Sequence, residues 1–134
     1  TLVRSETQAR PAVIAELTLS EALGLTTPRE TILPSELAQG PDDRPMVVLE
    51  VTAPVSEYRP GDLIWLRPIE PDQASGVINR DCLVPKSGGR FVFGRLIDTS
   101  GSKVGVLPVQ SGQKQQVIDK PEWIAVTEML VRKL

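Results

Sequence analysis

The stretch MVVLEVTAPVSEYRPGDLIWL, residues 46–66, decides the fold class because it joins two apolar runs through a turn-rich middle. In residues 47–52 the apolar Val47, Leu49 and Val51 alternate with a second set, Val48, Glu50 and Thr52, that includes polar side chains. This is the period-two pattern of a strand whose two faces meet different surroundings. Residues 63–66 are apolar throughout and follow a Pro-Gly-Asp turn, so they predict a short strand buried on both faces rather than a helix. Trp65 is therefore expected in the core. The stretch predicts two strands joined by an irregular crossing.

The N-terminal residues give weaker patterns. Residues 1–12 are polar with scattered charges, which predicts a linker or arm ahead of the folded domain. Residues 13–19 alternate enough for a short strand. A brief helix over residues 21–23, ended by Gly24, is an alternative that the pattern leaves open.

Prolines and glycines divide the rest of the chain. The four prolines within residues 26–45 exclude a long regular element there and leave room for a single helical turn at residues 35–38. Residues 73–76 predict a surface loop, and Ser87-Gly88-Gly89 predicts the turn of a hairpin. Further strands are expected at residues 77–84, 91–97, 103–109 and 123–131, with brief pairing at 116–118. Pro108 predicts an edge position or a bulge.

Short strands separated by such turns predict a mostly β, mainly antiparallel domain with at most one or two short helices. The 134 residues suffice for one domain with a hydrophobic core. The single cysteine, Cys82, cannot form an internal disulfide. The chain has no histidine, which removes the commonest zinc ligand and general base. We therefore expect neither a metal site nor a cofactor.

Charge and hydropathy narrow the choice of partners. The net charge of -2 gives no electrostatic footprint for nucleic acid. Lys86, Arg90 and Arg95 could form a small basic patch, although a solvated hairpin tip is the simpler interpretation. No apolar run approaches the roughly 20 residues that a membrane helix needs, and no signal peptide is visible. The sequence predicts a soluble protein of the reducing cytoplasm, and its start at Thr1 suggests a fragment or processed form of a longer protein.

The order and spacing of several motifs resemble the C-terminal domain of LexA-type and phage repressors. These motifs are an apolar strand, a proline-containing segment, Gly-Asp, a second apolar strand, a return arm reading FVFGRLI and a terminal strand reading WIAVTEMLV. The resemblance covers residues 46–134. It implies a mostly β domain, residues 13–134, that dimerises the repressor, with a DNA-binding helix-turn-helix domain upstream of Thr1. Many members of the family also cut their own linker with a serine nucleophile and a lysine base.

Both catalytic positions that the resemblance implies are altered in this sequence. The serine position falls on Ala53, which has no nucleophilic oxygen, and the lysine position falls on Gly94. The adjacent Arg95 cannot serve as the base, because a guanidinium stays protonated. The Ala-Gly or Cys-Gly bond at which the family is cut does not occur in the sequence. The resemblance therefore implies a non-catalytic oligomerisation and regulatory domain.

Two other interpretations stay open. A self-cleaving peptidase would need Ser56 as the nucleophile and a lysine from elsewhere, such as Lys86 or Lys103, with a pKa lowered by burial. The simpler interpretation of Ser56 is an ordinary loop serine. Alternatively, the chain is a small β domain that is unrelated to repressors and binds a ligand or peptide.

The terminal strand is the predicted self-association surface, because it carries apolar residues on both faces. The candidate residues are Trp123, Ile124, Val126, Met129 and Val131. Burial in the domain's own core would explain the same pattern. The expected partners are further copies of the chain, in a homodimer or higher homo-oligomer, and DNA only through the upstream domain. Since autocleavage is not expected, we also predict an antirepressor protein that relieves repression, and no contact with a membrane.

Overall fold

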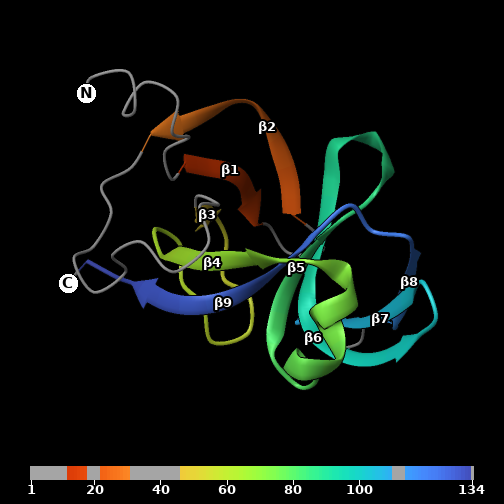
Figure 1. Cartoon of the computed structure of the whole chain (residues 1–134). Helices are drawn as coiled ribbons and strands as arrows, with labels where there is room; N and C mark the ends of the chain where they lie inside the picture. Colours follow the sequence, from red (N-terminus) through yellow and green to blue (C-terminus); the bar gives the residue numbers. More distant parts are fainter. Residues whose placement is uncertain (1–11, 18–21, 31–45, 110–113, 134) are drawn as a thin grey trace, which may run out of the picture.

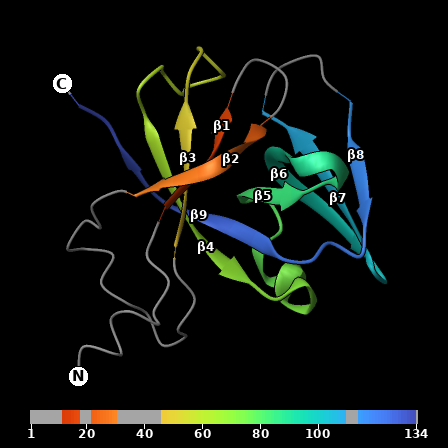
Figure 2. The same cartoon turned by 90° about the horizontal axis from the view of Figure 1, so that it is seen from above.

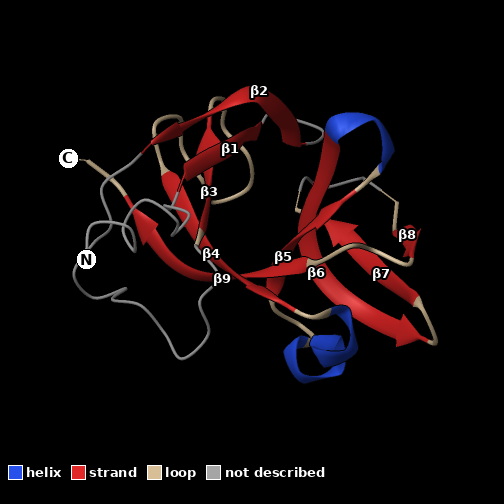
Figure 3. Ribbon diagram, turned by 45° about the horizontal axis from the view of Figure 1, so that its top comes forward, coloured by secondary structure: helices blue, strands red, loops and turns tan. Residues whose placement is uncertain are grey.

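The computed structural model describes residues 12–17, 22–30, 46–109 and 114–133, which form one curled β-sheet (Figure 1). The strands are β1 (Ala12–Leu17), β2 (Ala22–Glu30), β3 (Val47–Val51), β4 (Leu63–Ile69), β5 (Asp81–Pro85), β6 (Arg90–Ser100), β7 (Lys103–Pro108), β8 (Gln116–Asp119) and β9 (Ile124–Val131). In the described part of the chain, the 3-10 helices η2 (Pro71–Val77) and η3 (Ser87–Gly89) lie before and after β5 and are blue in Figure 3.

The strands hydrogen-bond in the order β2-β1-β3-β4-β9-β5-β6-β7-β8. β1 and β3 run parallel, and the other neighbouring pairs run antiparallel. The sheet curls so far that β2 also pairs with β6. Figure 2 shows β1 to β4 on one side of the molecule and β5 to β8 on the other, with β9 passing between them. The prediction of a mostly β, mainly antiparallel domain with few short helices is confirmed.

Residues 46–66 form the predicted strand, crossing and strand. β3 and β4 pair antiparallel, with Val48 opposite Trp65. Because successive side chains of a strand point to opposite faces, Leu49 packs in one core cluster and Val48 in another. Residues 64–66 of β4 are at most 1% exposed, so both faces of this strand are buried and Trp65 is a core residue.

The buried apolar side chains that the structure describes form three clusters. The first comprises Ala15, Leu17, Leu49, Val51, Val55, Tyr58, Ile64, Leu66, Leu83, Phe93 and Ala125. The second comprises Ala74, Cys82, Val84, Val92, Leu96, Val104, Val106, Ile124 and Val126, and the third comprises Val13, Val48 and Trp65. Burial raises the pKa of the Cys82 thiol to about 12. The free cysteine is therefore a small apolar packing residue and not a reactive thiol.

The N-terminal strands differ in part from the prediction. β1 confirms the strand expected at residues 13–19 and begins at Ala12, the last residue of the predicted arm. The brief helix considered for residues 21–23 is wrong, because β2 starts at Ala22. Residues 1–11 and the helical turn expected at residues 35–38 lie outside the described residues.

β2 also overturns the expectation that prolines exclude a long element from residue 26 onward. The strand runs to Glu30 and includes Pro28. Its register with β1 shifts between Gly24 and Arg29. Pro28 lies in this interval, and its missing N–H therefore costs no regular ladder hydrogen bond.

The segment between β4 and β5 was predicted incorrectly. β4 continues through Pro68 to Ile69, and residues 73–76 belong to η2 instead of a loop. Glu70 and Gln73 close the first turn of η2, since the Glu70 backbone N–H donates to Gln73 Oε1 at 3.0 Å. The strand expected from residue 77 therefore begins only at Asp81, after a turn in which Asn79 has a φ of 74°.

The C-terminal half follows the prediction closely. β5 and β6 form the expected hairpin around Ser87-Gly88-Gly89. β7 ends at Pro108, and β8 pairs only with residues 103–106 of β7, so Pro108 lies at a local edge as predicted. The brief pairing expected at residues 116–118 is β8, and the terminal strand is β9. None of the described helices has the length and apolar character needed to cross a membrane.

Candidate functional site

The crossing, residues 52–62, is the part of the fold in which the family resemblance predicts a catalytic serine. It begins at Thr52, whose backbone N–H and hydroxyl both donate to the carbonyl of Leu17, at 3.0 and 3.1 Å. A tight turn follows, in which Val55 and Tyr58 exchange two backbone hydrogen bonds of 3.2 and 2.8 Å. Val55 and Tyr58 both pack in the first core cluster. The crossing is therefore an anchored part of the core, although the turn residues between them are exposed.

Asp62 ends the crossing with a buried carboxylate that is only 1% exposed. The Arg132 guanidinium donates to both carboxylate oxygens, from Nε to Oδ1 at 2.8 Å and from NH2 to Oδ2 at 2.6 Å. The backbone N–H of Arg59 donates to Oδ2 at 2.9 Å. These hydrogen bonds, chiefly those from Arg132, hold the pKa of Asp62 below its ordinary value despite burial. The ion pair fastens the end of the crossing to the residue that follows β9.

Tyr58 connects the crossing to β5 and β6. Its hydroxyl donates to Asp81 Oδ2 at 2.9 Å, and its ring meets Phe93 edge-on at a centroid distance of 5.7 Å. Burial raises the pKa of Tyr58, and the adjacent Asp81 carboxylate raises it further, because both disfavour a phenolate.

We predict that Tyr58 will ionise only well above its ordinary pKa of 10.0 in the folded protein. Because Tyr58 is the single tyrosine of the chain, phenolate absorbance during an alkaline titration reports on it alone. In denaturant the midpoint should return to about 10. A folded-state pKa above the unfolded one means that the associated stabilisation is full below pH 10 and is lost as pH rises beyond it. A native midpoint equal to the denatured one would contradict this assignment.

The two positions that the resemblance assigns to a nucleophile and a base, Ala53 and Gly94, do not face each other. Ala53 lies half-buried in the crossing. In β6, Phe93 points to the first cluster and contacts Tyr58, whereas Val92 and Leu96 point to the second. By alternation Gly94 points away from the crossing. A Cβ at Gly94 would overlap the Leu107 carbonyl oxygen and lie 2.7 Å from Pro108 Cα, so the β7 backbone occupies this space. The residue that β6 presents to the crossing is therefore Phe93, which sequence reasoning missed.

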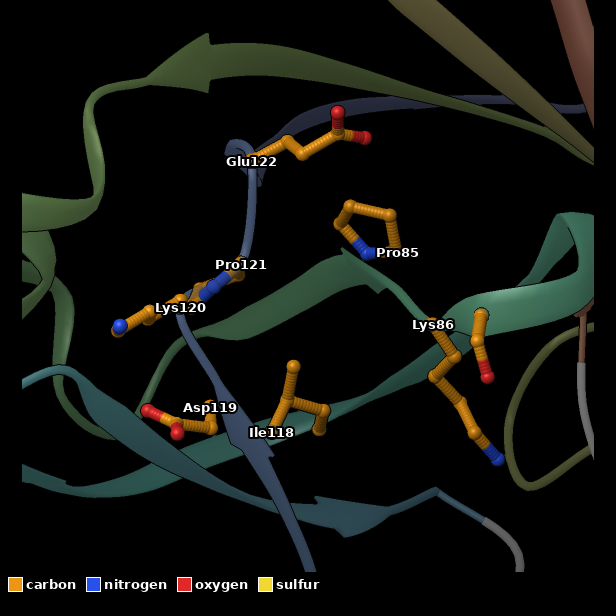
Figure 4. Close-up of a pocket in the computed structure, with 8 residues that line it drawn as sticks. Pro85, Lys86, Ile118, Asp119, Lys120, Pro121 and Glu122 are labelled. Atoms are coloured by element: carbon orange, nitrogen blue, oxygen red, sulfur yellow. The ribbon is translucent and has the colours of Figure 1, made fainter.

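The alternative pair, Ser56 and Lys86, is not assembled either. Ser56 lies exposed at the tip of the crossing turn, with a φ of 54°. Lys86 follows β5 and lines a pocket of about 220 Å³ between residues 85–87 and residues 118–122. Figure 4 shows the charged ends of Lys86, Lys120 and Glu122 pointing in different directions. Lys103 is exposed at the start of β7, opposite Asp119 of β8.

The three cations considered as a basic patch separate along the β5–β6 hairpin. Lys86 and Arg90 flank its turn. Arg95 lies opposite Asp81, at the other end of the pairing. The solvated hairpin tip is therefore the better description. Among the described residues, no group of three or more His, Cys, Asp or Glu side chains could hold a metal ion.

The residues predicted for self-association separate into buried and accessible ones. Ile124 and Val126 are fully buried in the second cluster, so they belong to the domain's own core and cannot form a surface. Trp123 is partly buried and its ring lies 5.8 Å from that of Phe91. Met129 and Val131 are partly buried against the third cluster. Sequence reasoning missed Leu130, which is 40% exposed.

Among the described strands, the segment that carries Leu130 is paired on one side only. β4 pairs with β9 up to Leu63 opposite Val131, whereas β5 pairs with β9 only at Val126 and Ala125. Residues 128–131 therefore have no strand beside them on the side away from β4, within the part of the chain that the structure describes. We call this side of residues 128–131 the open edge. In Figure 1 this part of β9 runs beside β4 toward the C-terminus.

Two arginines and a carboxylate mark the start of the open edge. Glu128 forms an ion pair of 2.9 Å with Arg67 of β4 and lies 3.8 Å from Arg80. Arg80 also donates to the carbonyl of Thr127 at 2.5 Å, where β5 diverges from β9. The regular pairing of β5 with β9 thus ends at Arg80.

The sequence matches no protein-family model, and no curated protein matches it.

Proposed function

We propose that this chain is the non-catalytic self-association and regulatory domain of a transcriptional repressor of the phage or LexA type. The observation that carries the proposal is the open edge of β9 with its exposed Leu130. An unpaired strand edge with an apolar side chain is a template for pairing with another chain, which natural proteins otherwise protect. In a symmetric dimer the same edge of both copies would meet around a two-fold axis.

Three features of the candidate site support a non-catalytic role. Ala53 has no nucleophilic oxygen, and neither Phe93 nor Gly94 has a group that could accept a proton. Gly94 also has the β7 backbone where a side chain would lie. Ser56 is exposed and belongs to a different part of the surface from the pocket that Lys86 lines. A serine–lysine mechanism needs its two groups within hydrogen-bond reach.

Self-association of this domain would serve DNA binding by a domain upstream of Thr1. Two tethered DNA-binding domains engage paired half-sites as a unit, because binding of one raises the effective concentration of the other at its half-site. Such a repressor works in the cytoplasm and touches DNA only through the upstream domain. A repressor that does not cut itself has to be relieved by another route, and an antirepressor protein that binds this domain would provide it. A pull-down from induced cells that recovers no specific protein would count against the antirepressor.

We predict that the chain self-associates and that Leu130→Asp weakens this self-association by at least tenfold. A carboxylate at a central interface position would have to lose its hydration or keep the strands apart, and about 1.4 kcal/mol already changes the dissociation constant tenfold. Sedimentation equilibrium over a wide range of concentrations measures the dissociation constants of Leu130→Asp and of the wild type.

Val117→Asp is the matched control, because Val117 is an apolar residue that is 62% exposed on β8, the last strand in the order, which is separated from β9 by β5, β6 and β7. This variant should self-associate like the wild type. A wild-type chain that is strictly monomeric at every concentration would contradict the proposed function. If Leu130→Asp and Val117→Asp weaken self-association equally, the open edge of β9 is not the self-association surface.

A further inference from the structure

Arg132 occupies a position that the family resemblance did not single out. It follows β9 directly, one residue after Val131, which forms the last residue pair with Leu63 of β4. Its guanidinium binds the buried Asp62 carboxylate in bidentate geometry, and its NH2 also donates to the carbonyl of Glu57 at 3.4 Å. One side chain thus links the end of β9 to the start of β4 and to the crossing.

We call the Arg132–Asp62 ion pair the clasp. It lies on the β4 side of β9, which is the side opposite the open edge. Asp62 immediately precedes β4, so the Arg132–Asp62 pair continues the β4–β9 ladder by one further step. Terminal strand residues fray unless something ties them down. Asp62 is 1% exposed and Arg132 is partly exposed, so the anchor lies within the fold while the residue it holds is at the surface.

An ordered edge matters for association because a strand that frays has to be ordered again when a partner pairs with it. Fixing backbone dihedrals costs conformational entropy for each residue, and this cost is subtracted from the affinity. A strand edge that is ordered before the encounter avoids it. The open edge is only four residues long. Ordering its last two or three residues is therefore a large part of the entropy cost of ordering the whole edge.

We propose that Arg132 is a positioning residue for self-association, which holds residues 128–131 of β9 as an ordered strand so that the open edge can pair with a second copy. This inference rests on the proposed function. Arg132 need not touch the partner, because it acts through the β9 backbone. The bidentate geometry predicts that lysine cannot replace it, since an ammonium group presents no planar fork to the carboxylate.

The test compares Arg132→Gln, Arg132→Lys and Val104→Ala with the wild type. Val104 is a core residue of β7, remote from the end of β9 in the strand order, and its truncation lowers stability without touching the clasp. Dissociation constants are measured by sedimentation equilibrium at a temperature at which all four proteins are folded. Hydrogen exchange of the backbone amides of residues 128–131 is followed at concentrations at which the four proteins are monomeric.

We expect Arg132→Gln and Arg132→Lys to raise the dissociation constant about tenfold or more and to accelerate exchange at residues 128–131. Val104→Ala should leave both quantities unchanged although it melts at a lower temperature. If the Arg132 variants melt earlier but associate like the wild type, Arg132 is only structural and the inference is overturned. A wild-type chain that is monomeric throughout overturns the proposed function itself, which is a different result.

Discussion

Replacing Asp62 by alanine is expected to lower the free energy of unfolding by about 3 kcal/mol. The substitution removes a buried acceptor of three hydrogen bonds, two from Arg132 and one from the backbone N–H of Arg59. Arg132 is partly exposed and can be hydrated again, which keeps the loss at the lower end of the range for buried ion pairs. Chemical denaturation followed by tryptophan fluorescence measures the change. Asp72→Ala, at an exposed carboxylate, should be nearly neutral.

The pH dependence of this loss provides a second check. The pKa of Asp62 is held below its ordinary value of 3.8 in the folded protein. A depressed folded-state pKa means that the stabilisation is complete above the unfolded pKa and is lost as pH falls through the folded one. The difference in unfolding free energy between wild type and Asp62→Asn should therefore be constant at neutral pH and shrink below pH 3.8. A difference that persists unchanged into strong acid would contradict the role of the Asp62 charge.

Local sequence patterns predicted the elements whose structure depends on local chemistry. Alternation in residues 47–52 and the apolar run at 63–66 gave β3 and β4, and a Ser-Gly-Gly turn gave the β5–β6 hairpin. Patterns failed where tertiary pairing decides. β2 extends through Pro28 because the shifted register with β1 leaves the missing N–H without consequence, and no local signal contains that register.

The same distinction separates the parts of the candidate site. Period two indicated that β9 is apolar on both faces, but which residues are covered depends on the neighbouring strands. Ile124 and Val126 lie beside the second cluster, whereas Leu130 lies beyond the end of β5 and is exposed. The Asp62–Arg132 ion pair joins residues that are 70 positions apart, so sequence spacing could not predict it. The sequence signal that could have suggested a partner is the place of Asp62 in a Gly-Asp turn directly before an apolar run.

The alignment of Gly94 with a family lysine was a prediction from motif spacing. The structure allows a test of whether any side chain fits at this position. Gly94→Ala is expected to lower the free energy of unfolding by about 3 kcal/mol, near the upper end for overpacking. The new Cβ would lie 2.7 Å from Leu107 C and from Pro108 Cα, and these are backbone atoms of a paired strand that cannot rotate away. β7 would have to move from β6, although its Val104 and Val106 are buried in the second cluster. The melting temperature should fall by roughly 10 °C.

Two other glycines serve as controls for this prediction. Gly76→Ala places its Cβ in open space, and Gly105→Ala meets chiefly the flexible end of the Gln115 side chain, so both should change the melting temperature little. Gly94→Lys should destabilise at least as much as Gly94→Ala, because the longer side chain begins with the same Cβ. A Gly94→Ala variant that melts like Gly76→Ala would show that β7 can yield at this point. That result would make room for a lysine at position 94 and weaken the structural argument against a base there, whereas the expected loss would show that the β7 backbone occupies the space that a side chain at position 94 needs.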